Sequence, residues 1–182
     1  MMMSIDGFVA GPSDELDWID NDPVMGHAHF VLAEGADSAI IGHTVYHGMA
    51  QFWPQAAANP DAQNNEAEFG RLMNDMHKIV VSTKVEELAW TNCEQLLVTS
   101  DDDLVEQIRA LKSQPGEYLL LYGGVRTAQT FISHGLVDEY RLDVCPTALS
   151  AGKALFPERT KLSFVSVTPY ESGAMTVTYE PA

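Results

Sequence analysis

Short apolar runs alternate along the chain with stretches of helical periodicity. Three of these runs end at a small residue, namely 39–41 before Gly42, 78–81 before Ser82 and 118–122 before Gly123. Continuous apolar runs are typical of strands that are buried on both faces, so we expect parallel strands here. The alternation of such strands with helices predicts an α/β unit.

Two helices are predicted from apolar spacing and end signals. The first follows Ser100 and the aspartates 101–103, which suit a helix N-terminus. The second begins after Gly124 and ends at Gly135. Their inward faces comprise Leu104, Val105, Ile108 and Leu111 in the first, and Val125, Ala128, Phe131 and Ile132 in the second.

The C-terminal part of the sequence has a different pattern. Apolar and charged residues alternate over 139–144, which predicts a strand with two unlike faces that ends at Pro146. Segments 162–168 and 174–179 flank a short turn and predict an antiparallel hairpin added to the sheet. Segment 55–65, rich in Ala, Asn, Gln and Pro, is expected to be an exposed, mobile loop.

The length of the chain fits a single domain spanning residues 1–182. Domains most often comprise about 100–150 residues, so the 182 residues suffice for one sizeable core. No segment approaches about 18 consecutive apolar residues and the start does not resemble a signal peptide, so we expect a cytoplasmic protein. We interpret Cys93 and Cys145 as buried small residues and not as a disulfide.

The charge of the chain excludes several classes of partner. The 26 acidic and 10 basic residues give a formal net charge of −16. This charge repels the phosphate backbone and anionic lipids. Neither nucleic acid nor a membrane is therefore an expected partner.

Candidate chemistry is concentrated where strand 118–122 meets the following helix. Gly123 and Gly124 precede Val125-Arg126-Thr127. Free N–H groups at a helix start favour an anionic ligand, and glycine permits close backbone approach. The alternative is an ordinary tight turn, because neither the G-x-G-x-x-G pattern nor the G-x-x-x-x-G-K-[ST] pattern is present.

Ordered landmarks over nearly the whole chain resemble one known family. They are SIDGFVAG at 4–11, ELDW at 15–18, GHTVYHGM at 42–49, FWP at 52–54, KIVVS at 78–82, WTN at 90–92, YGG at 122–124, GLVDEY at 135–140 and PTALSAGKALF at 146–156. These segments resemble the dihydrofolate-reductase-like family that includes the RibD C-terminal reductase domain of riboflavin biosynthesis.

The resemblance implies a fold and an activity. The fold is a three-layer α/β sandwich, with a mixed, mostly parallel central sheet and a C-terminal antiparallel hairpin. The implied activity is NADPH-dependent reduction of a pterin-like or pyrimidine-like small molecule, as in dihydrofolate reductase and 5-amino-6-(5-phosphoribosylamino)uracil reductase. Fold similarity alone does not determine the substrate.

The resemblance also implies positions for the cofactor. Gly123, Gly124 and Thr127 would lie against its diphosphate, with the Gly123–Gly124 peptide in the cis form. Gly42, Thr44 and Ser82 would contact the adenosine side of the cofactor. Ala10 and Gly11 would lie near the nicotinamide.

On the substrate side, Asp6 and Trp18 are the candidate catalytic residues. A carboxylate near a strand end can bind ring N–H groups, and an indole can stack on a flat heterocycle. Each residue also has a structural interpretation, because Asp6 before Gly7 can shape a turn and Trp18 can belong to the core.

The chain departs from the family at two positions. His43 and Thr83 stand where the family has arginines that grip phosphates. A neutral imidazole does not replace a guanidinium fork, so Lys84 or Arg126 would have to compensate.

Two other functions remain open. The first is a non-catalytic small-molecule or nucleotide-binding module on the same fold, which the missing arginines favour. The second is a zinc enzyme, because His43 and His47 would share a helix face while His27 and His29 would share a strand face. The H-E-x-x-H pattern is absent, and we assign no metal.

A homodimer is the expected assembly. A sheet edge exposes unpaired backbone and an apolar face, and a two-fold contact covers both. The riboflavin-type relatives that the chain resembles pair through this region. The candidate interface residues are Tyr140, Leu142, Val144, Met175, Val177 and Tyr179.

Overall fold

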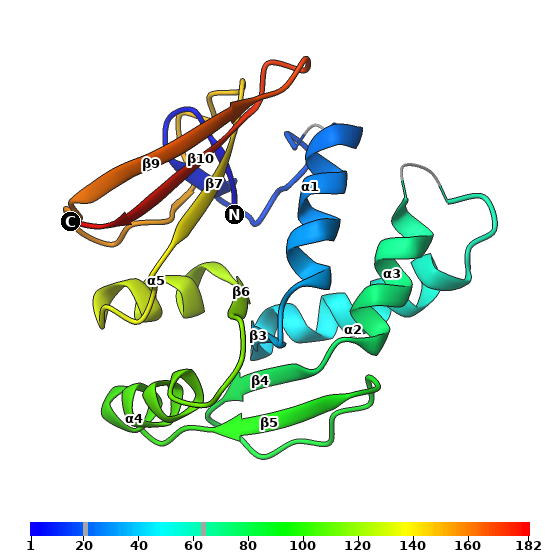
Figure 1. Cartoon of the computed structure of the whole chain (residues 1–182), viewed down its shortest axis with the longest axis vertical. Coiled ribbons are helices and arrows are strands. Elements are labelled where there is room, and N and C mark those ends of the chain that lie inside the picture. The colour runs from blue at the N-terminus through cyan, green and yellow to red at the C-terminus, as the bar shows by residue number, and fades with distance from the viewer. Residues whose placement is uncertain (20–21, 63–64) are drawn as a thin grey trace. The chain divides into compact units, whose positions relative to one another are not determined.

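The computed structural model describes residues 1–19, 22–62 and 65–182, and these form two compact units. One unit, here called the terminal unit, combines Met1–Met25 with Ala128–Ala182, and the other, the central unit, is the continuous segment Gly26–Thr127. Each unit has its own hydrogen-bonded strands (Figure 1). A single domain over residues 1–182 stays a prediction.

The central unit contains a four-stranded parallel sheet. Its strand order is β5-β4-β3-β6, and the strands are β3 (Ser38–Gly42), β4 (Lys78–Ser82), β5 (Cys93–Leu97) and β6 (Leu119–Gly123). β3 is buried at every position and β4 at all but one, as expected for strands covered on both faces. The α/β class with a mostly parallel sheet is therefore confirmed.

Five helices occur in the described part of the chain. They are α1 (Pro23–Glu34), α2 (His43–Ala58), α3 (Glu66–Asp75), α4 (Asp101–Lys112) and α5 (Val125–Ser133). α4 and α5 are the two helices that the apolar spacing predicts. α1 and α3 have no counterpart among those predictions.

The loop predicted over 55–65 is wrong in its first part. α2 continues through Pro54 to Ala58, and Ala56 is buried. The reason is tertiary packing, because a Cβ on Gly70 of α3 would lie only 2.7 Å from the backbone nitrogen of Ala57. Residues 63 and 64 of the predicted loop lie outside the described residues.

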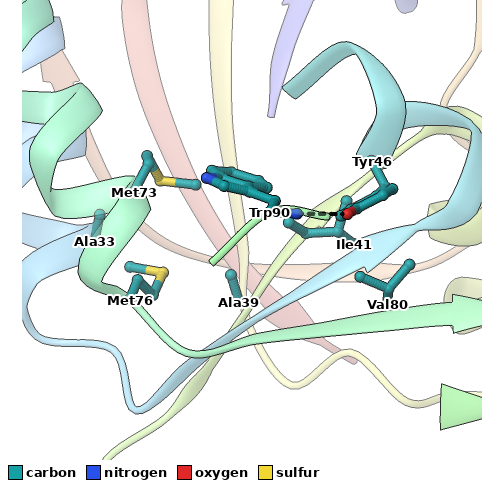
Figure 2. Close-up of a cluster of buried hydrophobic side chains, with 8 residues drawn as sticks. All are labelled: Ala33, Ala39, Ile41, Tyr46, Met73, Met76, Val80 and Trp90. Carbon is teal, nitrogen blue, oxygen red and sulfur yellow. Dashed lines mark hydrogen bonds between the residues drawn. The ribbon is translucent and has the colours of Figure 1, made fainter. Parts of the chain in front are cut away.

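The core of the central unit lies between its sheet and its helices. Figure 2 shows eight buried side chains that meet there, namely Ala33, Ala39, Ile41, Tyr46, Met73, Met76, Val80 and Trp90. The Tyr46 hydroxyl accepts a hydrogen bond of 3.1 Å from the backbone N–H of Trp90. This bond fastens the segment that joins β4 to β5 onto α2.

The terminal unit contains a mixed sheet in the order β1-β7-β10-β9. β1 pairs in parallel with β7, while β10 pairs antiparallel with both β7 and β9, so the predicted hairpin is confirmed. A separate antiparallel pair joins β2 to β8. The strands are β1 (Met2–Ser4), β2 (Phe8–Ala10), β7 (Tyr140–Cys145), β8 (Lys153–Ala154), β9 (Leu162–Pro169) and β10 (Met175–Pro181).

Two expectations about β7 and β10 are wrong. Asp143 does not lie on a solvated face, because it is buried and accepts a hydrogen bond of 2.6 Å from the Thr176 hydroxyl. Tyr140, Leu142 and Val177 are buried within this chain and do not form a surface for a second copy.

Cys93 and Cys145 are free thiols, as predicted. Cys145 is buried, whereas Cys93 is only partly covered. None of the described helices is both long enough and apolar enough to cross a bilayer.

Candidate functional site

The carboxyl ends of three neighbouring strands bring the predicted cofactor residues of the central unit to one edge. Gly42 of β3 is in register with Val81 of β4, and Ile41 is in register with Gly123 of β6. Because the strands are parallel, the residues that follow them leave the sheet on the same side. They form three short groups, namely Gly42, His43 and Thr44; Ser82, Thr83 and Lys84; and Gly123, Gly124, Arg126 and Thr127. We call this set the strand-end edge.

Two helices begin at the strand-end edge. α2 starts at His43 with Gly42 as its N-cap, a residue with no side chain to accept from the first-turn N–H groups. α5 starts at Val125, directly after Gly124. Unpaired N–H groups and the positive end of the helix dipole favour an anion at such positions.

Close packing within the protein requires the glycines of this edge. A Cβ on Gly42 would lie 2.1 Å from Thr127 Oγ1 and 2.9 Å from the Gly123 carbonyl oxygen. Gly124 has φ of +80°, and a Cβ there would lie 2.8 Å from Val45 Cγ2. A side chain at Gly124 would therefore strain the fold itself, so its substitution does not isolate a contact with a ligand.

The Gly123–Gly124 peptide is trans, so the cis form implied by the resemblance is wrong for this chain. The turn is instead made by two successive residues with positive φ, +73° at Gly123 and +80° at Gly124. Glycine adopts such values without steric cost.

Ser82 shapes the loop that leaves β4. Its buried hydroxyl donates to the Lys84 carbonyl oxygen at 2.9 Å and accepts from the Lys84 N–H at 3.1 Å. The Gln95 side chain on β5 donates to the same carbonyl and accepts from the Glu86 N–H at 3.4 Å. Thr83 and Lys84 are thus presented on a braced, exposed segment.

One cluster at this edge was not predicted from the sequence. His43 and His47 share a face of α2 as expected, and Glu86 meets them from the loop after β4. His43 Nε2 lies 3.0 Å from Glu86 Oε2, and His47 Nε2 lies 3.5 Å from the same oxygen. The sequence could not indicate this, because Glu86 reaches the histidines through an irregular connection.

The second histidine pair is placed differently from its prediction. His27 and His29 lie on α1, so the expected strand face is wrong. Residues two apart on a helix point about 200° apart and cannot share a ligand. The physical reason for the error is that the tertiary fold overrides a weak local pattern.

In the terminal unit, Asp6 braces a neighbouring loop. Its carboxylate accepts from the Ser4 hydroxyl at 2.6 Å, from the Ser150 N–H at 2.7 Å and from the Leu149 N–H at 3.1 Å. These bonds lower the pKa of Asp6 below its usual value of 3.8, the Ser4 bond most strongly. Asp6 is therefore a carboxylate at neutral pH and also serves the structure.

Trp18 belongs to a tight loop and not to the core. Its Nε1 donates to the Glu15 carbonyl oxygen at 3.1 Å, and that oxygen also accepts from the Gly11 N–H at 3.0 Å. The indole is partly exposed.

Ala10 and Gly11 lie at the end of β2, where a Cβ on Gly152 would come within 2.3 Å of the Ala10 carbonyl oxygen.

The predicted site residues are thus divided between the two units. The strand-end edge collects those expected around the adenosine and the diphosphate. The terminal unit holds Asp6, Ala10, Gly11 and Trp18, which were expected around the nicotinamide and the substrate.

Comparison with known proteins gives one family match and several relatives. The model of the RibD C-terminal domain family matches residues 1–176. The uncharacterized protein YyaP of Bacillus subtilis (strain 168) is 30% identical over 182 residues, which cover 98% of this chain and 91% of YyaP.

Solved structures show the same fold at low sequence identity. A candidate riboflavin biosynthesis protein from Shewanella sp. PV-4 has a TM-score of 0.74 and 19% identity, with 100% of this chain and 96% of that chain covered. The Thermotoga maritima diaminohydroxyphosphoribosylaminopyrimidine deaminase/5-amino-6-(5-phosphoribosylamino)uracil reductase has a TM-score of 0.66 and 16% identity. All of this chain is matched there, but only 55% of the Thermotoga chain.

Proposed function

The chain belongs to the RibD C-terminal domain family, and from this premise we propose that it is an NADPH-dependent reductase of a small pyrimidine-like or pterin-like heterocycle. The observation that carries the proposal is the strand-end edge. Two helix starts, glycines and two basic residues follow the carboxyl ends of these parallel strands. Ligands of open α/β sheets bind outside such strand ends.

The donors of the strand-end edge fit an anionic dinucleotide. The first-turn N–H groups of α2 and α5 would hold the diphosphate, and the Thr44 and Thr127 hydroxyls would add hydrogen bonds. Lys84 and Arg126 supply positive charge for the phosphates in a chain whose net charge is −16. When bound, NADPH would supply the hydride, and the protein would position the ring that receives it.

Asp6 and Trp18 are the proposed substrate-side residues. With its pKa lowered by hydrogen bonds, Asp6 would accept from a ring N–H and would not donate a proton. The partly exposed Trp18 ring would stack on a flat heterocycle. The proton that accompanies the hydride would then come from solvent.

A fluorescence titration with NADPH and NADH tests the cofactor part of the proposal. Lys84→Ala should weaken NADPH binding by roughly 10-fold, because a charge-assisted hydrogen bond to phosphate is lost. The affinity for NADH should fall less if Lys84 contacts the 2′-phosphate, which only NADPH carries. Lys161→Ala is the matched control, since it removes an exposed lysine that is not among the residues of the strand-end edge and should leave both affinities unchanged.

The same titration has outcomes that contradict the proposal. No saturable binding of either nucleotide to the unmodified chain at millimolar concentration would exclude the reductase. If Lys84→Ala and Lys161→Ala weaken NADPH binding equally, the phosphates of the cofactor do not bind at the strand-end edge.

A nucleotide-binding module without catalysis is the second candidate. It is favoured by the three hydrogen bonds that already occupy the Asp6 carboxylate and leave it little capacity for a substrate. Saturable NADPH binding, without NADPH consumption in the presence of pyrimidine or pterin substrates, would support this module over the reductase.

A further inference from the structure

We propose that His43, His47 and Glu86 form a binding site for one divalent transition-metal ion of the zinc class. The site offers three protein ligands, His43 Nε2, His47 Nε2 and Glu86 Oε2. This leaves one coordination position for a water molecule or an anionic oxygen. The inference does not rest on the proposed function, although His43 also belongs to the strand-end edge, because it concerns only the ion and these three side chains.

The spacing of the three donor atoms carries the proposal. His43 Nε2 lies 3.0 Å from Glu86 Oε2, His47 Nε2 lies 3.5 Å from it, and the two Nε2 atoms are 3.4 Å apart. Tetrahedral coordination at about 2.0–2.1 Å places neighbouring donor atoms about 3.3–3.4 Å apart. The triangle therefore has nearly the size of one face of a zinc coordination tetrahedron.

The imidazole rings of His43 and His47 approach the proposed ion position from different directions. Their centroids are 4.8 Å apart and their planes are inclined by 87°. The two nitrogens and the oxygen converge although the rings themselves do not stack. Two imidazoles with one carboxylate form a common ligand set of catalytic zinc sites, in which a fourth position stays open.

All three ligands are held by regular structure or by braced backbone. His43 is the first residue of α2 and His47 follows one turn later on the same face. Glu86 lies in the segment that Ser82 and Gln95 fasten through hydrogen bonds. The Tyr46 ring contacts the His47 ring edge-on, with centroids 5.3 Å apart. Little ordering remains to be done when an ion binds.

The environment of Glu86 also favours a cation. Its Oε1 is buried and has no hydrogen-bond donor among the described residues. Its Oε2 faces both imidazoles. A buried carboxylate oxygen without a donor is unfavourable, and a divalent ion at Oε2 would compensate the charge of the whole group.

Metal titration of the chelator-treated full chain tests the site. Co²⁺ should bind one ion per chain and give the strong visible absorption of a four-coordinate complex, and Zn²⁺ should displace it. His47→Ala and Glu86→Gln should each weaken binding at least about 10-fold. His47 is 58% exposed at its side chain, so the fold should tolerate its loss. Circular dichroism would check this for both variants.

His27→Ala is the matched control, because His27 is an exposed histidine on α1. It should leave the affinity and the Co²⁺ spectrum unchanged. No saturable Co²⁺ or Zn²⁺ binding at micromolar concentration would overturn the site, as would equal weakening by His27→Ala. In either case the contacts among His43, His47 and Glu86 are hydrogen bonds of the protein alone and not a metal site. NADPH is not present in the experiment, so its result is separate from that of the nucleotide titration.

Discussion

Lys78 is a completely buried lysine, with an exposed fraction of 0%. Its Nζ donates to the carbonyl oxygens of Met73 at 2.8 Å, Asn74 at 3.1 Å and Met76 at 2.6 Å. It also lies 4.4 Å from the centroid of the Trp90 ring. These carbonyls belong to the C-terminal end of α3, where a cation is favourable. The lysine that matches the family pattern thus stabilises a helix end.

Replacing this lysine by methionine keeps most of its length and removes its charge and donors. Lys78→Met should lower the free energy of unfolding by about 2–4 kcal/mol, because buried carbonyls lose their partners. Urea unfolding would measure the change. Lys161→Met alters an exposed lysine and should stay within about 0.5 kcal/mol of the unmodified chain. If both variants behave alike, the hydrogen bonds of Lys78 contribute no net stability.

Trp90 and Asn92, two further landmarks, also act on the end of α3. The Trp90 indole donates to Asn74 Oδ1 at 2.7 Å, and the Asn92 side chain donates to the Asp75 carbonyl oxygen at 2.6 Å. Some of the sequence landmarks shared with the family therefore stabilise the fold and do not contact a ligand.

At the scale of the element, α4 shows how local signals determine a helix start. Ser100 is the N-cap, and its side chain accepts from the Asp103 N–H at 3.2 Å. Asp103 in turn accepts from the Thr99 N–H at 2.7 Å and from the Gln107 side chain at 2.8 Å. This reciprocal arrangement satisfies free donors at the helix start.

These hydrogen bonds predict a specific acid dependence. The Thr99 backbone bond, followed by the Gln107 and Thr99 side chains, lowers the pKa of Asp103 below its usual 3.8. A lowered native pKa means stabilisation that is fully present above pH 3.8 and is lost as the pH falls through the native pKa. Asp103→Asn should remove this component from the acid limb of a stability curve.

Two measurements check the acid dependence. Carboxyl NMR should give a midpoint for Asp103 below 3.8. Urea unfolding at several pH values should show a shallower acid limb for Asp103→Asn than for Asp102→Asn. If the acid limb of Asp103→Asn equals that of Asp102→Asn, the hydrogen bonds of Asp103 do not stabilise the folded chain relative to the unfolded chain.

The elements that could be predicted from sequence are those with strong local signals. α4 has its serine cap and aspartates, and β3 and β4 are continuous apolar runs. α1 has a local start signal that the predictions did not use, because Asp22 precedes Pro23 and its side chain accepts from the N–H groups of Val24 at 2.8 Å and Met25 at 3.1 Å. The end of α2 was missed because contact with Gly70, and not local sequence, keeps residues 55–58 helical.

The same distinction applies to the candidate site. Gly42, Ser82 and Gly123 could be placed at one edge, because parallel strands deliver their ends together. Glu86 could not be predicted as a neighbour of His43, since 43 positions and an irregular segment separate them. The hydrogen bonds of Asp6 to residues 149 and 150 depend on contacts between distant parts of the chain.

At the scale of the whole molecule, β9 exposes an apolar edge. It is the last strand of its sheet, and Phe164, Val165 and Val167 are 62%, 47% and 49% exposed. Met175 of β10 is exposed beside it. Exposed apolar edge strands favour pairing with another chain, so a homodimer stays our prediction, and we now propose β9 as its interface.

Light scattering at moderate salt should report roughly twice the chain mass of 20.0 kDa. The net charge of −16 opposes association, but salt at physiological strength screens it over about 8 Å. Val165→Glu together with Val167→Glu should give the monomer, because charge on an edge strand prevents pairing. Val85→Glu, at an exposed valine outside this sheet, should leave the dimer intact.

A monomer of the unmodified chain at micromolar concentration would contradict the dimer. A dimer that survives the β9 substitutions would place the interface on another surface. Neither result would change the assignment of the fold.

The pairing of β1 with β7 has a consequence for synthesis on the ribosome. Met3 and Val144 are partners, so about 140 residues must be translated before β1 finds its neighbour. At about 5–20 residues per second this takes roughly 7–28 s. The strands of the parallel sheet all emerge earlier, from one continuous segment. During this interval the nascent chain carries an unpaired strand, which is the kind of segment that chaperones protect.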